Sequence, residues 1–252
     1  MDRSRRVLIA GESWVTHSIH QKGFDSFTTT AYTEGVGPLR DALEAGGFQV
    51  DYQPAHVAAR SFPDTAAELG AYGAVILSDI GANTLLLHPD TFERSVPRPD
   101  RLAAIRGHVT GGGGLVMVGG YLTFQGIDGK ARYAGTPVEA ALPVTLLPGD
   151  DRVEAPAGVV PVVRDAAHPI VAGLAEVAWP DLLGYNRVVP RAGASVVVTV
   201  GDDPLLVAGT HGAGRSVAFT SDCGPHWCPP PFVAWPGYAR MWQQLVGWVT
   251  GG

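Results

Sequence analysis

The stretch Gly111–Gly126, with the sequence GGGGLVMVGGYLTFQG, decides the fold class of this chain of 252 residues. Its first glycines end a helix and lead into Leu115–Val118, an unbroken apolar run typical of a parallel strand that is covered on both faces. Gly119 and Gly120 follow at once and can adopt backbone conformations that other residues avoid. A buried strand with a glycine elbow predicts an α/β protein, with Tyr121 exposed where ligands of such sheets bind.

Strands and helices alternate before the elbow. The strands that we expect are Arg6–Ala10, Phe48–Tyr52 and Ala74–Ser78, and the expected helices are Glu34–Ala45, Pro63–Leu69 and Pro99–Thr110. This alternation predicts a parallel sheet with right-handed crossovers. Residues 15–33 are long for a connection between a strand and a helix, so we expect a functional loop there.

The second half of the chain contains short strands among prolines and glycines. We expect a helix over Ala131–Ala140, strands over Val144–Leu147, Val159–Val163, Val188–Val189 and Ser195–Val200, a β-hairpin of Leu205–Thr210 and Arg215–Thr220, and a closing amphipathic helix over Tyr238–Thr250. No linker, repeat or low-complexity segment divides the sequence. Residues 1–252 are therefore expected to form a single domain.

Composition narrows the class of protein. The formal net charge is −6 and no basic stripe occurs, which argues against binding to nucleic acid or to an anionic membrane. The apolar run Val7–Ala10 is too short for a signal peptide, and no run reaches the length of a transmembrane helix. We expect a cytoplasmic protein with a small-molecule ligand.

The two cysteines, Cys223 and Cys228, are five residues apart. In the cytoplasm such residues are expected to be reduced thiols, because disulfides are rare there. A local disulfide or a pair of metal ligands is the alternative. A zinc site is not supported, because it needs further ligands at a characteristic spacing.

Three segments carry a family resemblance. They are Gly112–Tyr121 (GGGLVMVGGY), His168–Leu174 (HPIVAGL) and Pro204–Asp222 (PLLVAGTHGAGRSVAFTSD). They resemble the elbow strand, the HPI-x-x-GL segment and the late hairpin of the class I glutamine amidotransferase-like superfamily, in particular its ThuA-like branch and its uncharacterised glutamine amidotransferase homologues. The resemblance implies a flavodoxin-like three-layer sandwich, with a mostly parallel sheet, helices on both faces and a late β-hairpin.

The resemblance also implies an altered catalytic triad. Family members carry G-x-C-x-G-x-Q at the elbow, and Tyr121 occupies the register of the cysteine. The second signature has a histidine followed two residues later by a glutamate, and Thr220 and Asp222 occupy those positions. A phenol with a pKa of about 10 cannot replace a thiolate. We therefore expect no glutaminase activity.

Several polar and aromatic residues directly follow the expected strands, so they should converge at the carboxyl edge of the sheet. The candidate catalytic residues are Glu12, Asp79, Tyr121, Asp222 and His226. The candidate substrate-binding residues are Ser13, Trp14, Asn83, Gly120, Ser221 and Trp227, together with His17, His20 and Lys22 from a loop that would fold over the pocket. No cofactor and no metal ion are predicted.

Each of these roles has a structural alternative. Glu12 and Asp79 could cap a turn or a helix, and Tyr121 could be a packing aromatic with a partner for its hydroxyl. His226 lies in a proline-rich loop, which is either a rigid lid or the carrier of a general base or metal ligand. Cys223 could be a displaced nucleophile if it were accessible and in an electropositive setting.

A metal site is the alternative use of His17 and His20. Being three residues apart, the two histidines could share one face of a helix and bind an ion with Glu12 or Asp79. We favour a polar binding loop, because metal ligation also needs supporting hydrogen bonds around the ligands.

Two functions are compatible with the sequence. The first is an enzyme on a small polar substrate, such as a carbohydrate or an amide, with acid–base chemistry by the carboxylates and His226. By analogy with the ThuA-like branch, Trp14 and Trp227 would stack on a sugar. The second is a non-catalytic ligand-binding or assembly module of the same fold. We expect a homo-oligomer in either case, and ionisable groups with strongly shifted pKa values would favour the enzyme.

Overall fold

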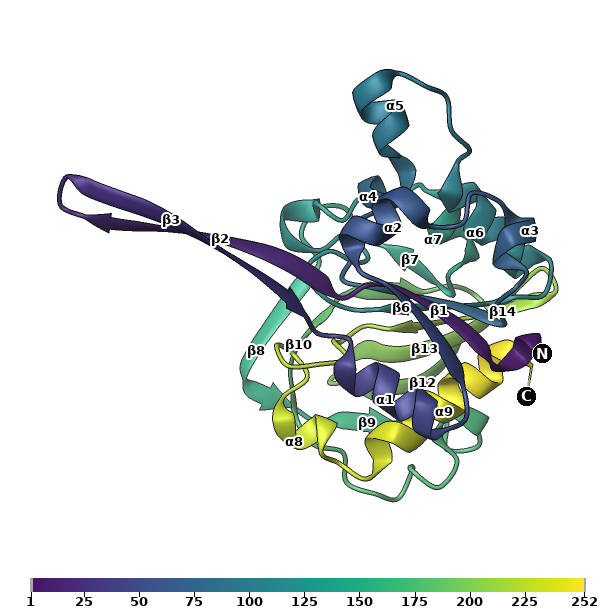
Figure 1. Cartoon of the computed structure of the whole chain (residues 1–252). Coiled ribbons are helices and arrows are strands. Elements are labelled where there is room, and N and C mark those ends of the chain that lie inside the picture. The colour runs from purple at the N-terminus through teal and green to yellow at the C-terminus, as the bar shows by residue number, and fades with distance from the viewer. Residues whose placement is uncertain (1, 252) are drawn as a thin grey trace.

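The computed structural model describes residues 2–251 and is built around an eight-stranded sheet (Figure 1). In spatial order its strands are β4 (Gln49–Gln53), β1 (Arg6–Gly11), β5 (Ala74–Ser78), β6 (Gly114–Val118), β14 (Gly214–Phe219), β13 (Asp203–His211), β12 (Ser195–Val200) and β9 (Pro161–Val163). The first five run parallel to one another, and the remaining three pairings are antiparallel. The predicted fold class and the late hairpin β13–β14 are confirmed.

Helices cover both faces of the sheet. One face packs on α1 (Gly37–Ala45) and α9 (Gly237–Thr250), and the other on α2 (Ala55–Ser61), α3 (Ala66–Leu69), α4 (Ala82–Leu86), α6 (Arg101–Thr110) and α7 (Pro137–Ala141). In β6, Val116 and Val118 face the first core, whereas Leu115 and Met117 face the second. The apolar run is unbroken because both of its faces are buried.

The remaining elements lie around this sandwich. They are the short helices α5 (Pro89–Arg94) and α8 (Pro230–Val233), the 3-10 turns Arg3–Arg5, Ile127–Gly129 and Pro169–Val171, and two small sheets that pair β7 (Val144–Leu146) with β11 (Val188–Pro190) and β8 (Arg152–Val159) with β10 (Leu182–Asn186). No helix within residues 2–251 has both the length and the apolar character that crossing a bilayer requires.

Residues 15–33 form a long β-hairpin, so the expectation that this segment is a loop was wrong. Strands β2 (Ser13–Lys22) and β3 (Asp25–Glu34) pair in antiparallel register over ten residue pairs and project from the body (Figure 1). The consecutive β-branched residues Thr28–Thr30 favour this extended conformation. The turn is Gly23-Phe24, and Gly23 takes the left-handed φ of +62° that a two-residue hairpin turn requires.

Several predicted helices are shorter in the structure, among them the one expected over Pro63–Leu69, which begins at Ala66. The first helix of the chain begins at Gly37 rather than Glu34, because Glu34 still pairs with Ser13 in the hairpin. The helix expected over Ala131–Ala140 is reduced to α7, since Gly135 has a φ of +75° and Thr136 caps the helix immediately afterwards.

Close backbone packing fixes the elbow that follows β6. Gly119 lies so near the neighbouring strand that a Cβ atom would sit 2.1 Å from the carbonyl oxygen of Thr220. Gly120 has a φ of +152°, which a side chain would strain. These two glycines are therefore required by the contact and by the turn.

The elbow is held in place by two buried polar residues, Asn186 and Asp151. No sequence pattern indicated either of them. The Asn186 carboxamide accepts a hydrogen bond from Gly120 N at 2.9 Å, and it donates to Gly120 O at 3.2 Å and to Asp151 Oδ1 at 2.8 Å. Asp151 in turn accepts from the backbone of Gln125 and Gly126 at 2.9 and 2.8 Å. The elbow is thus anchored by side chains from β10 and from the segment before β8.

We expect Asn186→Ala to destabilise the fold by about 2–4 kcal/mol, because it leaves the buried N–H and C=O of Gly120 without their side-chain partner and removes a hydrogen bond to Asp151. Urea unfolding of the two proteins measures the difference. Asn83→Ala is the matched control, since Asn83 is exposed on α4 and should change stability by less than about 0.5 kcal/mol. Equal losses for both variants would contradict the anchoring role of Asn186.

Candidate functional site

A cavity of about 430 Å³ opens at the carboxyl edge of the parallel strands. Its wall is formed by Glu12, Trp14, Asp79, Tyr121, Leu122, Ile127, Asp222, Pro225 and His226. All five candidate catalytic residues predicted from the sequence lie in this wall. They come together because β1, β5, β6 and β14 are parallel neighbours, so the segments after them meet at one edge.

Glu12 is the most deeply buried of the three acidic side chains, with 3% of its surface exposed. The Ser78 hydroxyl donates to Glu12 Oε2 at 2.5 Å, and Glu12 N donates to the carbonyl of Ser78 at 2.6 Å. Burial raises the pKa of Glu12 to about 7, and the nearby Asp79 carboxylate adds to this shift. Glu12 can therefore hold or release a proton near neutral pH.

Asp79 and Asp222 lie in similar surroundings. Asp79 Oδ1 accepts a hydrogen bond from Leu122 N at 2.8 Å, and Asp222 Oδ1 accepts from Cys223 N at 2.7 Å. Burial raises the pKa of both carboxyls, and for Asp222 the charges of Glu12 and Asp79 raise it further. No lysine or arginine of the described chain lies in the cavity wall. The three carboxyls therefore titrate as one interacting group.

The backbone turns in the same unusual way after β1 and after β5. Glu12 has a φ of +46° and Asp79 a φ of +43°, both in the left-handed region that residues other than glycine seldom adopt. Such conformations cost roughly 1–3 kcal/mol each and occur preferentially at functional sites. In this protein they belong to two of the three acidic residues of the cavity wall.

Aromatic rings also line the cavity. The Tyr121 and His226 rings meet edge to face, with 4.5 Å between centroids, and His226 Nδ1 lies 3.8 Å from Asp222 Oδ2. Glu154, which was not among the candidates from the sequence, accepts from the Tyr121 hydroxyl at 3.1 Å and from Trp227 Nε1 at 2.9 Å. Glu154 thereby ties the elbow to the loop that carries His226. It is a single glutamate in the middle of a strand, so no sequence pattern marks it.

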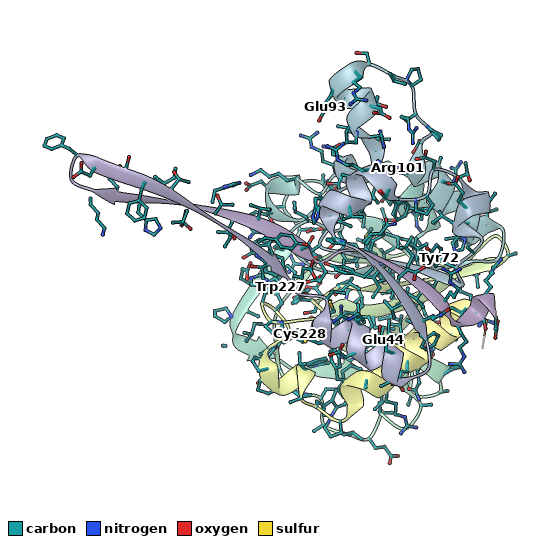
Figure 2. All side chains as sticks on the ribbon, in the orientation of Figure 1. Glu44, Tyr72, Glu93, Arg101, Trp227 and Cys228 are labelled. Carbon is teal, nitrogen blue, oxygen red and sulfur yellow. The ribbon has the colours of Figure 1, made fainter. Side chains whose placement is uncertain are left out.

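Trp227 is 1% exposed and does not line the cavity, so its proposed contact with a sugar is not supported by its position. Figure 2 labels it near the base of the hairpin. Its indole packs against Gly184, where a Cβ atom would lie 2.3 Å from Nε1. Trp227 therefore packs beneath the residues that line the cavity. Trp14, in contrast, is part of the wall and has 39% of its surface exposed.

Four further candidates lie outside the cavity wall. Ser13 Oγ accepts from Ala55 N at 2.8 Å, and the Ser221 hydroxyl donates to Gly184 O at 2.8 Å. Both serines are buried and connect backbone segments. Asn83 is exposed on α4. Gly120 is not part of the wall, but it directly precedes Tyr121 and lies near Asp79, whose Oδ1 would be 3.1 Å from a Cβ atom at that glycine.

His17, His20 and Lys22 do not fold over the cavity, which corrects the expected arrangement. They lie on β2 of the projecting hairpin, where His17 contacts the Thr30 hydroxyl at 2.9 Å and His20 stacks on Phe27. Residues three apart in a strand point to opposite faces. The two histidines therefore cannot bind one ion together with Glu12 or Asp79.

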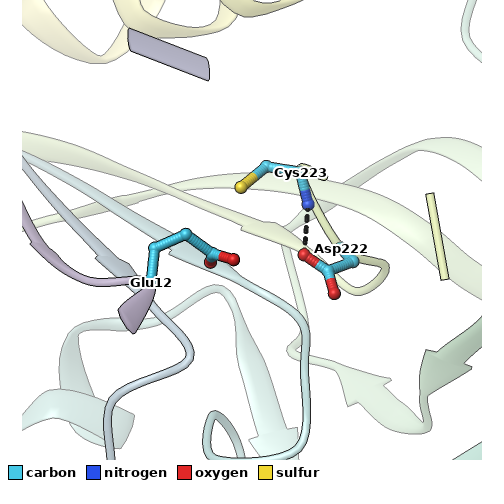
Figure 3. Close-up of side chains that lie close together, drawn as sticks. All are labelled: Glu12, Asp222 and Cys223. Atoms are coloured by element: carbon cyan, nitrogen blue, oxygen red, sulfur yellow. Dashed lines mark hydrogen bonds between the residues drawn. The ribbon is translucent and has the colours of Figure 1, made fainter. Parts of the chain in front are cut away.

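Cys223 and Cys228 are both buried free thiols, as expected for reduced cysteines. Burial, together with the charges of Glu12 and Asp222, raises the pKa of Cys223 well above its usual value, which disfavours a nucleophilic thiolate. Glu12, Asp222 and Cys223 each place one possible metal ligand within 4.8 Å of the others (Figure 3). Among the described residues these three could hold a divalent ion here, and His17 and His20, which the sequence offered as alternative metal ligands, are not part of the group.

The signature positions of the family differ in their surroundings. Tyr121 lies at the tip of the elbow, in the cavity wall. Thr220 is buried, and its hydroxyl donates to the carbonyl of Pro204 at 3.0 Å, away from the cavity wall. Asp222 lies in the wall.

Comparisons with known proteins agree with this fold. Residues 6–251 match the family model described as "Putative glutamine amidotransferase". Cytoplasmic protein STM3548 from Salmonella typhimurium is 44% identical, with a TM-score of 0.93 over 96% of this chain and 98% of that one. Cytoplasmic protein STM1381 from Salmonella typhimurium LT2 is also 44% identical, with a TM-score of 0.93 over 97% and 99% of the two chains.

A more distant structure shares only the fold. A ThuA-like protein from Parabacteroides merdae ATCC 43184 is 14% identical, with a TM-score of 0.56 over 98% of this chain and 90% of that one. No curated protein matches the sequence. The family match over nearly the whole chain and the two Salmonella structures lead to one conclusion: this chain belongs to the glutamine amidotransferase-like family.

Proposed function

We propose that this protein binds a small polar ligand in the cavity at the carboxyl edge of the sheet and transfers protons to and from it. Glu12, Asp79, Asp222 and His226 would be the acid–base groups, and Tyr121 would contact the ligand. The observation that carries the proposal is the convergence of three carboxyls with raised pKa values on one open cavity. Acid–base catalysts work best when their pKa lies near the working pH.

The charge of the cavity restricts the class of ligand. Its wall holds three carboxyls and one imidazole, and no lysine or arginine of residues 2–251 contributes to it. An anionic ligand would be repelled by any carboxyl that is ionised, whereas a neutral or cationic ligand would not. The Trp14 ring offers an apolar face in the same wall, which suits a sugar ring or a comparable flat polar molecule.

No step of the proposed function uses cysteine chemistry. Tyr121 and Thr220 occupy the registers of the family's cysteine and histidine, and Cys223 is buried with a raised thiol pKa. We therefore propose that the triad is degenerate. The two similar Salmonella structures are described as cytoplasmic proteins, which supports a cytoplasmic location here as well.

A non-catalytic assembly module of the same fold is the second candidate function. The projecting hairpin favours it, because a long exposed ribbon is typical of protein–protein contacts rather than of catalysis. The two candidates differ in whether a ligand of the cavity is converted or only bound.

The raised pKa of Glu12 predicts how the free energy of unfolding changes with pH. Its pKa is higher in the folded state, about 7, than its ordinary value of 4.5, so the folded protein retains a proton that the unfolded chain releases. The stabilisation is full below pH 4.5 and is lost as the pH rises through 7, by an amount on the order of 3 kcal/mol. We expect Glu12→Gln to gain stability relative to the wild type between pH 5 and pH 8, as measured by urea unfolding.

Glu93→Gln is the matched control for that experiment, because Glu93 is exposed on α5 (Figure 2). Its stability relative to the wild type should not change with pH over this range. A Glu12→Gln variant whose stability difference is the same at pH 5 and pH 8 would show that the Glu12 carboxyl is ionised in the folded protein at both values.

Ligand binding and turnover test the proposed function itself. Glucose, glucosamine, glucuronate and glutamine serve as neutral, cationic, anionic and amide probes, with calorimetry for binding and proton NMR for conversion. We expect glucuronate to bind at least about 10-fold more weakly than glucosamine, and Leu122→Trp, which fills the cavity, to abolish binding. Any conversion should fall roughly 10²- to 10⁴-fold in Glu12→Gln. Binding that survives Leu122→Trp contradicts the assignment of the cavity, and binding without conversion favours the assembly module.

Glutamine hydrolysis should be absent. We expect ammonia release from glutamine to equal the buffer background for the wild type and for Cys223→Ser, because no activated thiolate is present. Release by the wild type that Cys223→Ser abolishes would show that Cys223 acts as a displaced nucleophile.

A further inference from the structure

The hairpin β2–β3 has no partner within the part of the chain that the structure describes. Its two strands pair only with each other, so each has one edge without sheet hydrogen bonds. Figures 1 and 2 show the ribbon and its side chains standing clear of the body. An isolated two-stranded hairpin is marginally stable in water, and long unpaired edges invite association.

Both faces of the ribbon carry large apolar side chains. On one face Ile19 is 77% exposed, and Val15 and Tyr32 follow it toward the body. On the other face Phe27 is 49% exposed. Phe24 in the turn is fully exposed. Large exposed apolar side chains on a projecting ribbon indicate a surface that another molecule covers.

Charge does not oppose self-association of this segment. Residues 15–33 contain one lysine, Lys22, and one aspartate, Asp25, which face each other across the ribbon. The segment is therefore neutral apart from its two histidines, whereas the whole chain has a net charge of −6. Two copies can bring their ribbons together without charge repulsion, although their bodies share the same sign of charge.

The size of the ribbon favours a second copy of this chain over an unrelated partner. Ten residues per strand make each face about 34 Å long and about 10 Å wide, or about 340 Å². A single arm on an unrelated protein would bury about twice that area in total, which is below the usual size of a stable interface. In a reciprocal pair each copy gives one arm and receives another, so each buries about 700 Å², close to the usual value of about 800 Å².

We infer that β2–β3 is a dimerisation arm that packs reciprocally on a second copy of this chain. The interface adjoins the cavity, because β2 begins one residue after Glu12 and Trp14 belongs to both the ribbon and the cavity wall. The dimer interface therefore lies beside the opening of the proposed ligand site. It does not depend on that site being catalytic.

Sedimentation equilibrium of the full chain tests the inference. The wild type should be a dimer at about 10 μM, and the double variant Ile19→Lys/Phe27→Lys, which places a charge on both faces of the ribbon, should raise the dimer dissociation constant at least about 100-fold. Both side chains are exposed, so the far-UV circular dichroism and the thermal midpoint of the monomers should match the wild type. Phe92→Lys is the matched control, since Phe92 is 76% exposed on α5 and should leave the dimer intact.

Hydrogen exchange gives a second readout that does not require a variant. The amides of Thr28–Thr30 should be protected at concentrations where the dimer forms and should exchange freely on dilution. The inference is overturned if the wild type is still a monomer at about 100 μM, which is about 10-fold above the concentration at which we expect the dimer. It is also overturned if the arm variant associates as strongly as the wild type does. A monomer whose arm becomes protected only with phosphatidylglycerol vesicles also overturns it and assigns the arm to a lipid surface.

Discussion

The site of this protein depends on the burial of three carboxyls at one edge of a parallel sheet, in a cavity wall that contains no lysine or arginine of the described chain. Glu12, Asp79 and Asp222 lose most of their hydration there, and each raises the free energy of the ionised form of its neighbours. A protein core does not tolerate three such charges, so the group retains protons at a pH where isolated carboxyls have lost them. Burying ionisable groups in this way costs stability, as functional sites often do.

The sheet supplies the rigid frame that keeps these groups together. Each of the strands β1, β5, β6 and β14 ends at the same edge, and the elbow after β6 is fixed by Asn186 and Asp151 beneath it. The elbow thus presents a side chain to the cavity. In this chain that side chain is Tyr121, and Glu154 holds its hydroxyl.

The features that could be predicted from the sequence are those that follow from hydrophobic periodicity and from sheet topology. The buried run Leu115–Val118 indicated the parallel sheet, and the position of Glu12, Asp79, Tyr121, Asp222 and His226 just after strands was sufficient to expect them in one place. The sequence did not reveal Asn186, Asp151 or Glu154, because their partners are distant in sequence and their role emerges only after folding. The hairpin β2–β3 was misread as a loop since its threonines and histidines are polar, and its apolar residues are spread over both faces.

The proposed chemistry requires above all that Glu12 be protonated near neutrality because it is buried beside other carboxyls. This protonation can be measured directly by carbon-13 NMR of protein labelled at the glutamate carboxyl carbons, with the Glu12 signal identified by its loss in Glu12→Gln. We expect a titration midpoint near pH 7 for this signal. A midpoint near the ordinary value of 4.5 would contradict the proposed role of Glu12, since the cavity would then hold a solvated carboxylate and no proton to transfer.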